Sequence, residues 1–199
     1  MSAVVSLDAL LADRRLWRGQ PDPRPASNEP SGHAALDAAL PSGGWPEASL
    51  IEILLPADGL GELRLVLPTL ARHTRAGRDI AVIAPPYLPN PQAWWNAGVD
   101  LRHLHIVAAD ARHATWASEQ CLRSGCLSAV LCWPRSADDK ALRRLQVAAE
   151  TGRVLAFAFR DAKAADNPSP APLRLRCERG QLRVLKCRGL APTRPIPLH

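Results

Sequence analysis

The stretch EILLPADGLGELRLVL has the layout of a phosphate-binding loop. An apolar strand leads into a turn that contains Pro56, Gly59 and Gly61, and apolar residues at helical spacing follow. Phosphoryl transfer needs inward-facing backbone N–H groups, a Lys for the β/γ-phosphates and a hydroxyl for Mg²⁺. Here Glu62 stands in the lysine position and Leu63 in the hydroxyl position. The residues therefore predict a degenerate phosphate loop, structural and not catalytic.

A carboxylate at position 62 also changes the electrostatics of the loop. The helix dipole favours a negative side chain in the first turn by about 0.3–1 kcal/mol. Glu62 thus takes the place that an incoming anion would occupy, and it repels a triphosphate where an active ATPase supplies a cation. We expect no nucleotide cofactor.

The other reactive residue types give little support to an enzyme. The five cysteines are spaced C-x4-C and C-x5-C where they are close together, with no His at ligand spacing, so we expect no metal site. His103 and His105 alternate on an expected strand, and no acid or Ser/Cys nucleophile stands at suggestive spacing. We therefore expect no catalytic residue. A divergent ATPase, in which another residue such as Lys140 supplies the cation, remains an alternative hypothesis.

The elements that position the loop alternate between strand and helix. Short apolar runs predict strands at 50–55, 79–86, 103–110, 127–134 and 153–161, with helices between them. The sequence LRLRCERGQLRVLKCRG then predicts an antiparallel hairpin about residues 178–181. Such alternation indicates an α/β fold whose central, mostly parallel sheet is flanked by helices. We also expect a helix capped at Ser31 and a helix over 62–75 that Pro68 interrupts.

Composition divides the chain into one core and short flanking segments. The 199 residues are 47% hydrophobic and 22% charged, as in globular proteins. The patterns predict a helical arm at 1–18, a proline-rich linker at 19–30, a core domain at 31–188 and a proline-rich tail at 189–199. With no apolar run of 18 residues and no signal peptide, we expect a cytoplasmic protein without a membrane segment.

Two sets of residues are candidates for contact with partners. The net charge is +6, and the basic residues of the C-terminal part are candidates for non-specific contacts with DNA phosphates: Arg174, Arg176, Arg183, Lys186 and Arg188. The alternative, which we favour, is that they form one solvated face of a strand pair. The tryptophans Trp17, Trp94 and Trp95 are candidates for a protein-binding surface. Because Trp94 and Trp95 are adjacent on an expected helix, we expect one to pack inward and the other to lie at the surface.

Three segments of the sequence resemble RecA-like recombinase cores: SGHAALDAALPSGGWPEASLIEIL, AVIAPPYLPNPQAWWNAGVDLRHLHIVAAD and EQCLRSGCLSAVLCWP. The resemblance implies a RecA-like core from about residue 31 to residue 188. It also implies that a catalytic Glu should follow the strand that ends near Ala84, and that an acid for Mg²⁺ should stand at Cys132 or Trp133. Neither acid is present, which again predicts that phosphoryl chemistry is absent.

Within that superfamily the chain is most similar to the ImuA family, RecA-like accessory proteins of bacterial mutagenic translesion synthesis. This resemblance implies protein partners, namely an ImuB-like polymerase homologue and RecA itself. The alternative is a SulA-like inhibitor of cell division, which binds the tubulin-like division protein. Composition and spacing do not separate these two hypotheses.

Overall fold

The protein is described by a computed structural model that covers residues 26–59, 61–135, 137–178, 180–187 and 195–197. The strands are β1 (Leu50–Leu55), β2 (Ile80–Ile83), β3 (Leu104–Val107), β4 (Ala129–Cys132), β5 (Leu155–Asp161), β6 (Leu173–Glu178), β7 (Gln181–Cys187) and β8 (Ile196–Pro197). The α-helices are α2 (Ala34–Ala39), α3 (Leu67–Arg75), α4 (Pro91–Asn96), α5 (Ala114–Arg123) and α6 (Asp139–Gly152). Short 3₁₀ helices are η1 (Glu62–Leu65), η2 (Leu101–His103) and η3 (Ala162–Asp166).

All described strands join one sheet, in the order β3-β2-β4-β5-β1-β6-β7-β8. Neighbours from β3 to β6 are parallel, and β7 and β8 add two antiparallel pairings. The hairpin turns where Glu178 pairs with Gln181, as the sequence predicted. The predicted fold class, a mostly parallel α/β sheet with a C-terminal antiparallel hairpin, is confirmed.

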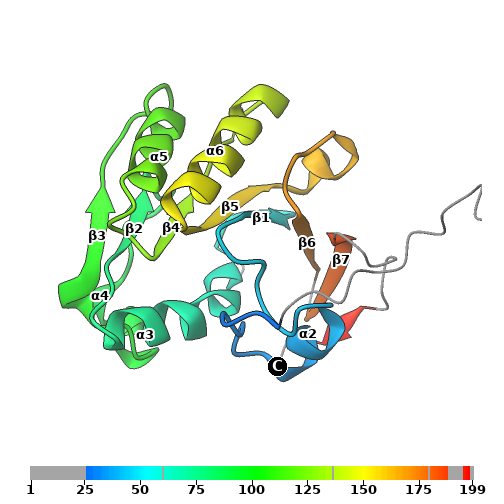
Figure 1. Ribbon diagram of the computed structural model, residues 1–199, viewed down its shortest axis with the longest axis horizontal. Helices are drawn as coiled ribbons and strands as arrows, with labels where there is room; N and C mark the ends of the chain where they lie inside the picture. The colour runs from blue at the N-terminus through cyan, green and yellow to red at the C-terminus, as the bar shows by residue number, and fades with distance from the viewer. Residues whose placement is uncertain (1–25, 60, 136, 179, 188–194, 198–199) are drawn as a thin grey trace, which may run out of the picture.

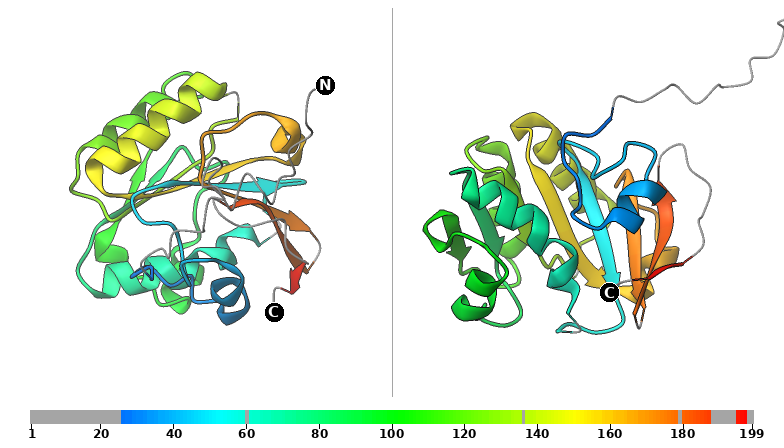
Figure 2. Two further views of the ribbon diagram at one scale, coloured as in Figure 1. Left: turned by 45° about the vertical axis from the view of Figure 1, so that its right-hand side comes forward. Right: turned by 90° about the horizontal axis from the view of Figure 1, so that it is seen from below.

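Helices cover both faces of the parallel part of the sheet. Helices α5 and α6 lie on one face, and α3 and α4 lie on the other (Figures 1 and 2). Side chains of β5 alternate between the two cores: Phe157 and Phe159 join the core on the α3 side, whereas Ala156 and Ala158 face α5 and α6. The indole of Trp45 packs edge-on against Phe157, with ring centroids 5.3 Å apart. Because both faces are covered, all six residues of β1 are buried.

Pro68 divides the helical segment after β1, as predicted. The 3₁₀ helix η1 ends at Leu65, and α3 begins at Leu67 with Pro68 in its first turn. A proline is tolerated there because backbone N–H groups of the first turn have no partner within the helix. The interruption makes η1 a separate unit that carries Glu62.

The segment before β1 differs from expectation in two ways. Helix α2 begins at Ala34 with His33 at the N-cap, so the predicted cap at Ser31 is wrong; the Ser31 hydroxyl instead accepts a hydrogen bond from the backbone N–H of His33. Glu29, in the expected linker, is bonded to Arg72 and His73 of α3. The part of this linker that the structure describes is therefore attached to the core.

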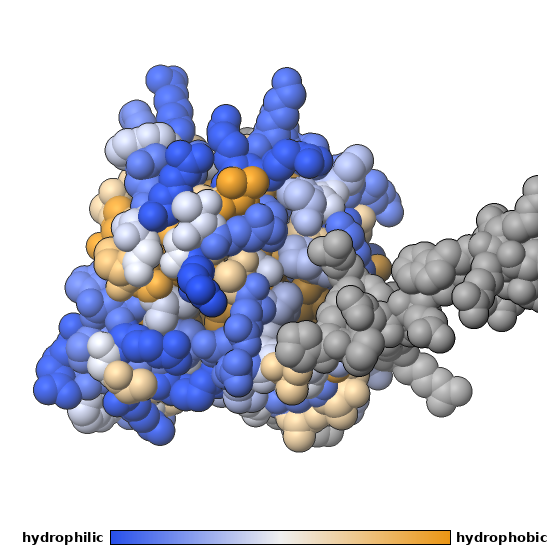
Figure 3. All heavy atoms as spheres, in the orientation of Figure 1, coloured by the Kyte–Doolittle hydropathy of each residue, from blue (hydrophilic) through white to orange (hydrophobic). Residues whose placement is uncertain are grey.

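The C-terminal end of the described chain also joins the fold. Ile196, in the expected tail, is buried and pairs with Leu182 on β7. A proline next to it is tolerated because β8 lies at the edge of the sheet. On the surface seen in Figure 3, apolar side chains form small, separate patches. Among the described residues, no helix is both long and apolar enough to cross a membrane.

Candidate functional site

The degenerate phosphate loop lies at the carboxyl end of β1. Gly59 and Gly61 adopt left-handed backbone conformations, with φ of 79° and 86°. This shape brings the backbone N–H of Gly59 to 3.1 Å from Oε1 of Glu62. In a phosphate loop such N–H groups point at the phosphates. Here one of them donates to a carboxylate that belongs to the same loop.

Glu62 is held inside the protein and not extended into solvent. Its side chain is buried, and its second oxygen, Oε2, has no hydrogen-bond partner among the described residues. It also lies close to Cys177 of β6: burial, and then the negative charge of Glu62, raise the pKa of the Cys177 thiol to about 12. The Glu62 carboxyl group is therefore held within the loop, and its effect on a triphosphate stays a prediction. Leu63 packs against the larger core and offers no hydroxyl.

Two neighbouring segments contact the loop, which is itself largely exposed. Asp58 forms an ion pair with Arg135, which follows β4. The ring of Tyr87, which follows β2, lies close to Gly59, since a Cβ atom added at Gly59 would meet Tyr87 Cε2 at 3.8 Å. A hollow of only about 190 Å³ remains beside the Asp58–Arg135 pair. Pro56 lies exposed at the start of the loop.

The ends of β2 and β4 lack the acids that the recombinase resemblance requires. Cys132 and Trp133 are buried, and the Trp133 ring stacks on Phe159 with centroids 4.9 Å apart. Burial raises the pKa of the Cys132 thiol to about 12, so this thiol does not supply a negative charge for Mg²⁺ near neutral pH. Ala84, at the end of β2, has no side chain for acid–base chemistry and adopts a φ of 45°.

A buried cluster of charges lies behind this edge of the sheet. Glu52 on β1 is fully buried and accepts hydrogen bonds from Arg160 on β5, at 2.6 Å, and from Arg174 on β6, at 2.7 Å. Arg160 also donates to the carbonyl of Ala137. Arg174 donates to three further carbonyls, of Ala164, Ala165 and Asn167. The cluster therefore holds two loops at the carboxyl edge. The signal for a buried charge was present in the sequence, since Glu52 stands inside an apolar strand.

Because of this cluster, the prediction that Arg174 contacts DNA phosphates is wrong. Arg174 is buried and bound to Glu52, so it does not belong to a surface that meets DNA. Arg176 and Arg183 face each other across β6 and β7, half-exposed, and each lies 3.7 Å from Glu178. Lys186 is exposed and donates to the carbonyl of Ser169. Arg188 lies outside the described residues.

Of the two adjacent tryptophans of α4, one packs inward and the other lies at the surface, as expected. Trp94 is 3% exposed and belongs to the core, whereas Trp95 is 60% exposed. An exposed Trp of this size is typical of protein-binding surfaces. Trp17, the third candidate, lies outside the described residues.

His103 and His105 meet an acid that sequence spacing did not reveal. Asp79, which precedes β2, lies 2.8 Å from Nδ1 of His103 and 3.5 Å from Nε2 of His105. The hydrogen bond from His103 lowers the pKa of the exposed Asp79. In the part of the chain that the structure describes, no group of three His, Cys, Asp or Glu is arranged to hold a metal ion.

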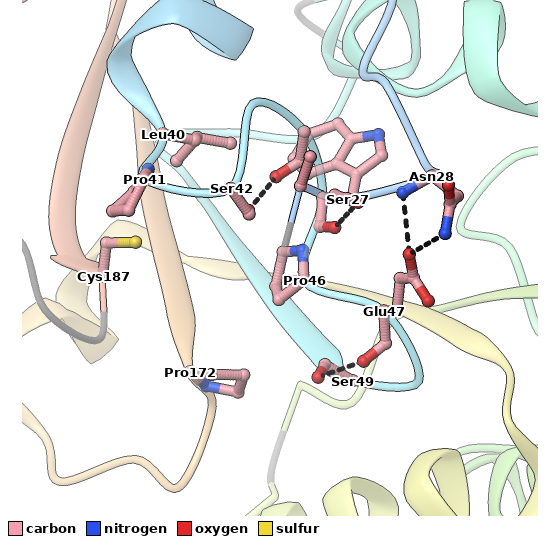
Figure 4. A pocket seen from close by; sticks show the side chains of 13 residues that line it. Ser27, Asn28, Leu40, Pro41, Ser42, Pro46, Glu47, Ser49, Pro172 and Cys187 are labelled. Atoms are coloured by element: carbon pink, nitrogen blue, oxygen red, sulfur yellow. Dashed lines mark hydrogen bonds between the residues drawn. The ribbon is translucent and has the colours of Figure 1, made fainter. Parts of the chain in front are cut away.

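A hollow of about 370 Å³ lies beside the amino end of β1, between the segment 26–28 and the loop 40–49 (Figure 4). Its polar groups bond one another: Ser27 Oγ donates to the carbonyl of Trp45 at 2.6 Å, and the backbone N–H of Asn28 donates to Glu47 at 2.7 Å. Three prolines form much of the remaining wall: Pro41, Pro46 and Pro172. These interactions hold the wall together.

Comparison with known proteins finds no family model that matches the chain. The chain is similar to RecA from Thermotoga neapolitana, at 28% identity over 155 residues, which are 74% of this chain and 44% of that protein. It is also similar to RecA from Nocardioides sp., at 33% identity over 103 residues, which are 51% of this chain and 29% of that protein. The chain thus spans less than half the length of these RecA proteins.

Among solved structures, the chain is similar to SulA from Pseudomonas aeruginosa. The TM-score is 0.48 and the identity 26%, over 58% of this chain and 98% of that one. The chain is thus similar to RecA over part of its length, and its described strands form a mostly parallel sheet.

Proposed function

We propose that the chain is a RecA-like accessory protein of SOS-induced mutagenic translesion synthesis, similar to ImuA, which binds other proteins and does not hydrolyse ATP. The observation that carries this proposal is the closed loop after β1, in which Glu62 accepts the N–H of Gly59. Loop N–H groups, a cation and a metal-binding acid act together in phosphoryl transfer. In this loop the N–H of Gly59 is bound by the carboxylate of Glu62. No Lys stands at position 62 to supply the cation, and Leu63 and Cys132 offer neither a hydroxyl nor an acid for the metal ion.

The distant similarity to RecA supports a role in the response to DNA damage. A RecA-type core that does not act on phosphates still has a rigid sheet covered by helices. In this proposal, the surfaces of these helices bind other proteins. We propose two partners: an ImuB-like polymerase homologue and RecA. DNA contact is limited, in this proposal, to weak phosphate contacts through exposed residues such as Arg176 and Arg183.

Trp95 is the residue that we assign to the partner surface. It lies on α4, on the face of the sheet opposite α5, where Trp116 is exposed to the same extent, 61% against 60%. Binding experiments with the purified polymerase homologue therefore have a matched control. We expect Trp95→Ala to weaken binding about 30-fold, the effect of a 2 kcal/mol hot spot, and Trp116→Ala to leave it unchanged.

The same experiment includes the tubulin-like division protein and RecA as separate ligands. Binding of the polymerase homologue, with or without RecA, supports the proposal. Binding of the division protein with no binding of the polymerase homologue contradicts it and favours a SulA-like inhibitor. Equal loss of binding in both tryptophan variants contradicts the assignment of Trp95.

A further inference from the structure

Three side chains that lie far apart in the sequence form a hydrogen-bonded chain at the amino edge of the sheet. Nε2 of His73 lies 2.8 Å from Oε2 of Glu29, and Nδ1 of His73 lies 2.9 Å from Oγ of Ser128. Glu29 precedes α2, His73 lies in the last turn of α3, and Ser128 directly precedes β4. A hydroxyl, an imidazole and a carboxylate in this order form the arrangement of an activated nucleophile, its base and the group that orients the base.

The surroundings fix which nitrogen of His73 is free to act as a base. A carboxylate only accepts hydrogen bonds, so the contact with Glu29 places a proton on Nε2. In the neutral ring, Nδ1 then carries a lone pair directed at the hydroxyl of Ser128. The Ser128 hydroxyl also lies within donating distance of the carbonyl of Asp79, at 3.0 Å, so this carbonyl and Nδ1 of His73 are the two acceptors for its proton. His73 itself is fully buried, with both ring nitrogens in hydrogen-bonding contact.

The backbone holds Ser128 in place. Its N–H donates to the carbonyl of Asp79 at 2.8 Å, and its own carbonyl accepts from Leu155 at the start of β5, at 3.2 Å. The nucleophile therefore stands on the sheet, between the starts of β2 and β5. Rigid placement of this kind favours reaction because little reorganisation is needed.

Ser128 and Glu29 line a cavity of about 530 Å³. Binding sites for small molecules are commonly of this size. The rim includes Gly125 and Gly152, where α5 and α6 end, and a side chain at Gly152 would collide with the carbonyl of Leu122. Arg78 and Arg153 line the same cavity, as do Glu47 and Asp79, and Nη1 of Arg78 lies 3.5 Å from Oε1 of Glu29.

We propose that Ser128 is an activated nucleophile, with His73 as its general base and Glu29 as a positioning residue, in a site for small polar esters. Oγ of Ser128 bonds to the carbonyl carbon of the ester and passes its proton to Nδ1 of His73. The carbon–oxygen bond to the leaving alcohol breaks, and that alcohol takes the proton from His73. Water, deprotonated by His73, then releases the acid and restores the serine. This activity goes beyond the proposed function and does not depend on it.

A fluorophosphonate probe tests the proposal, because it forms a stable bond to an activated serine as fluoride leaves. We expect the folded protein to gain one adduct, located by mass spectrometry at Ser128, and the urea-denatured protein to gain none. Ser49 is the matched control: it lies at the same edge of the sheet, its hydroxyl donates to the carbonyl of Glu47, and no histidine of the described residues is hydrogen-bonded to it. Ser49→Ala should label like the wild type, and Ser128→Ala should not label.

Variants of the other two residues separate activation from mere exposure. His73→Gln should lower the labelling rate about 100-fold or more, the usual contribution of a general base. Glu29→Gln should lower it less, and Glu29→Asp should restore part of the loss. Circular dichroism identifies variants that keep the fold. The proposal is overturned if the folded wild type takes no probe at Ser128, if labelling survives denaturation, or if folded His73→Gln labels at the wild-type rate.

Discussion

The two edges of the central sheet use their charged side chains differently. At the carboxyl edge, Glu62 binds the N–H of its own loop and Asp58 pairs with Arg135, so charged groups close the place that resembles a nucleotide site. At the amino edge, Glu29 and His73 form a directed chain that ends at Ser128, beside a cavity. The carboxyl edge thus resembles a phosphate-binding site in sequence but has neither the Lys nor the hydroxyl residue of a phosphate loop. The amino edge, which resembles no such motif, carries the hydrogen-bonded chain from Glu29 to Ser128.

The largest effect is expected for the buried charge behind the carboxyl edge. Glu52→Ala leaves Arg160 and Arg174 buried without their counter-ion. Removing one partner of a buried ion pair costs about 3–5 kcal/mol of unfolding free energy. Urea denaturation of the variant measures this loss directly.

Glu178→Ala is the control for that measurement. Glu178 lies between Arg176 and Arg183 at the surface, and such pairs contribute about 0–1 kcal/mol. A loss below about 1 kcal/mol in Glu52→Ala would contradict the assignment of a structural role to the buried cluster.

At the amino edge, acid should weaken the fold through Glu29. Burial alone would raise its pKa, but the hydrogen bond and charge of His73, followed by Arg72, outweigh burial and lower the pKa from 4.5 to about 2. Because the folded-state pKa lies below the unfolded value, the stabilisation is present above pH 4.5 and is lost as the pH falls toward 2. We expect this stabilisation to contribute roughly 2 kcal/mol to the free energy of unfolding.

Denaturation of wild type and Glu29→Gln at several pH values measures this term. The difference in stability between the two proteins should shrink between pH 4.5 and pH 2, since over this range Glu29 binds a proton in the unfolded state before it does so in the folded state, whereas the amide side chain of the variant does not titrate. A difference that stays constant over this range would show that Glu29 is not the titrating group.

The smallest effect concerns Cys177, beside the closed loop. Glu62→Gln removes the negative charge that, after burial, raises the pKa of this thiol. We expect faster alkylation of Cys177 at alkaline pH, by less than about tenfold because burial remains. Alkylation of Cys126, which is exposed, provides the reference rate and should not change. An unchanged rate at Cys177 would contradict the position assigned to the Glu62 carboxylate.

The fold was largely predictable because its signals are local. Alternating apolar runs and helical periodicity located the parallel strands, and Pro68 correctly marked the break between η1 and α3. The adjacent pair Trp94 and Trp95 was also predicted correctly, since neighbouring helical residues point about 100° apart. Each of these features depends on a few consecutive residues.

Glu52 inside an apolar strand signalled a buried charge, but the sequence did not show the partners in either charged cluster, because these residues meet only in the folded chain. Arg174 alternates with apolar residues like a surface side chain, but its partner Glu52 is 122 residues away. Glu29 stands in a proline-rich segment, and it reaches His73 across 44 residues. Sequence spacing gave no sign that Ser128 lies next to that histidine.

Nucleotide binding tests the central claim most directly: titration of wild type and Glu62→Lys with a fluorescent ATP analogue and Mg²⁺. Glu150→Lys on α6 is the control, because it makes the same change of charge at an exposed position on another element. The closed loop predicts no saturable binding by wild type or Glu150→Lys, and measurable binding by Glu62→Lys. Saturable, Mg²⁺-dependent binding or turnover by the wild type, abolished by changes within residues 59–63, would contradict the account.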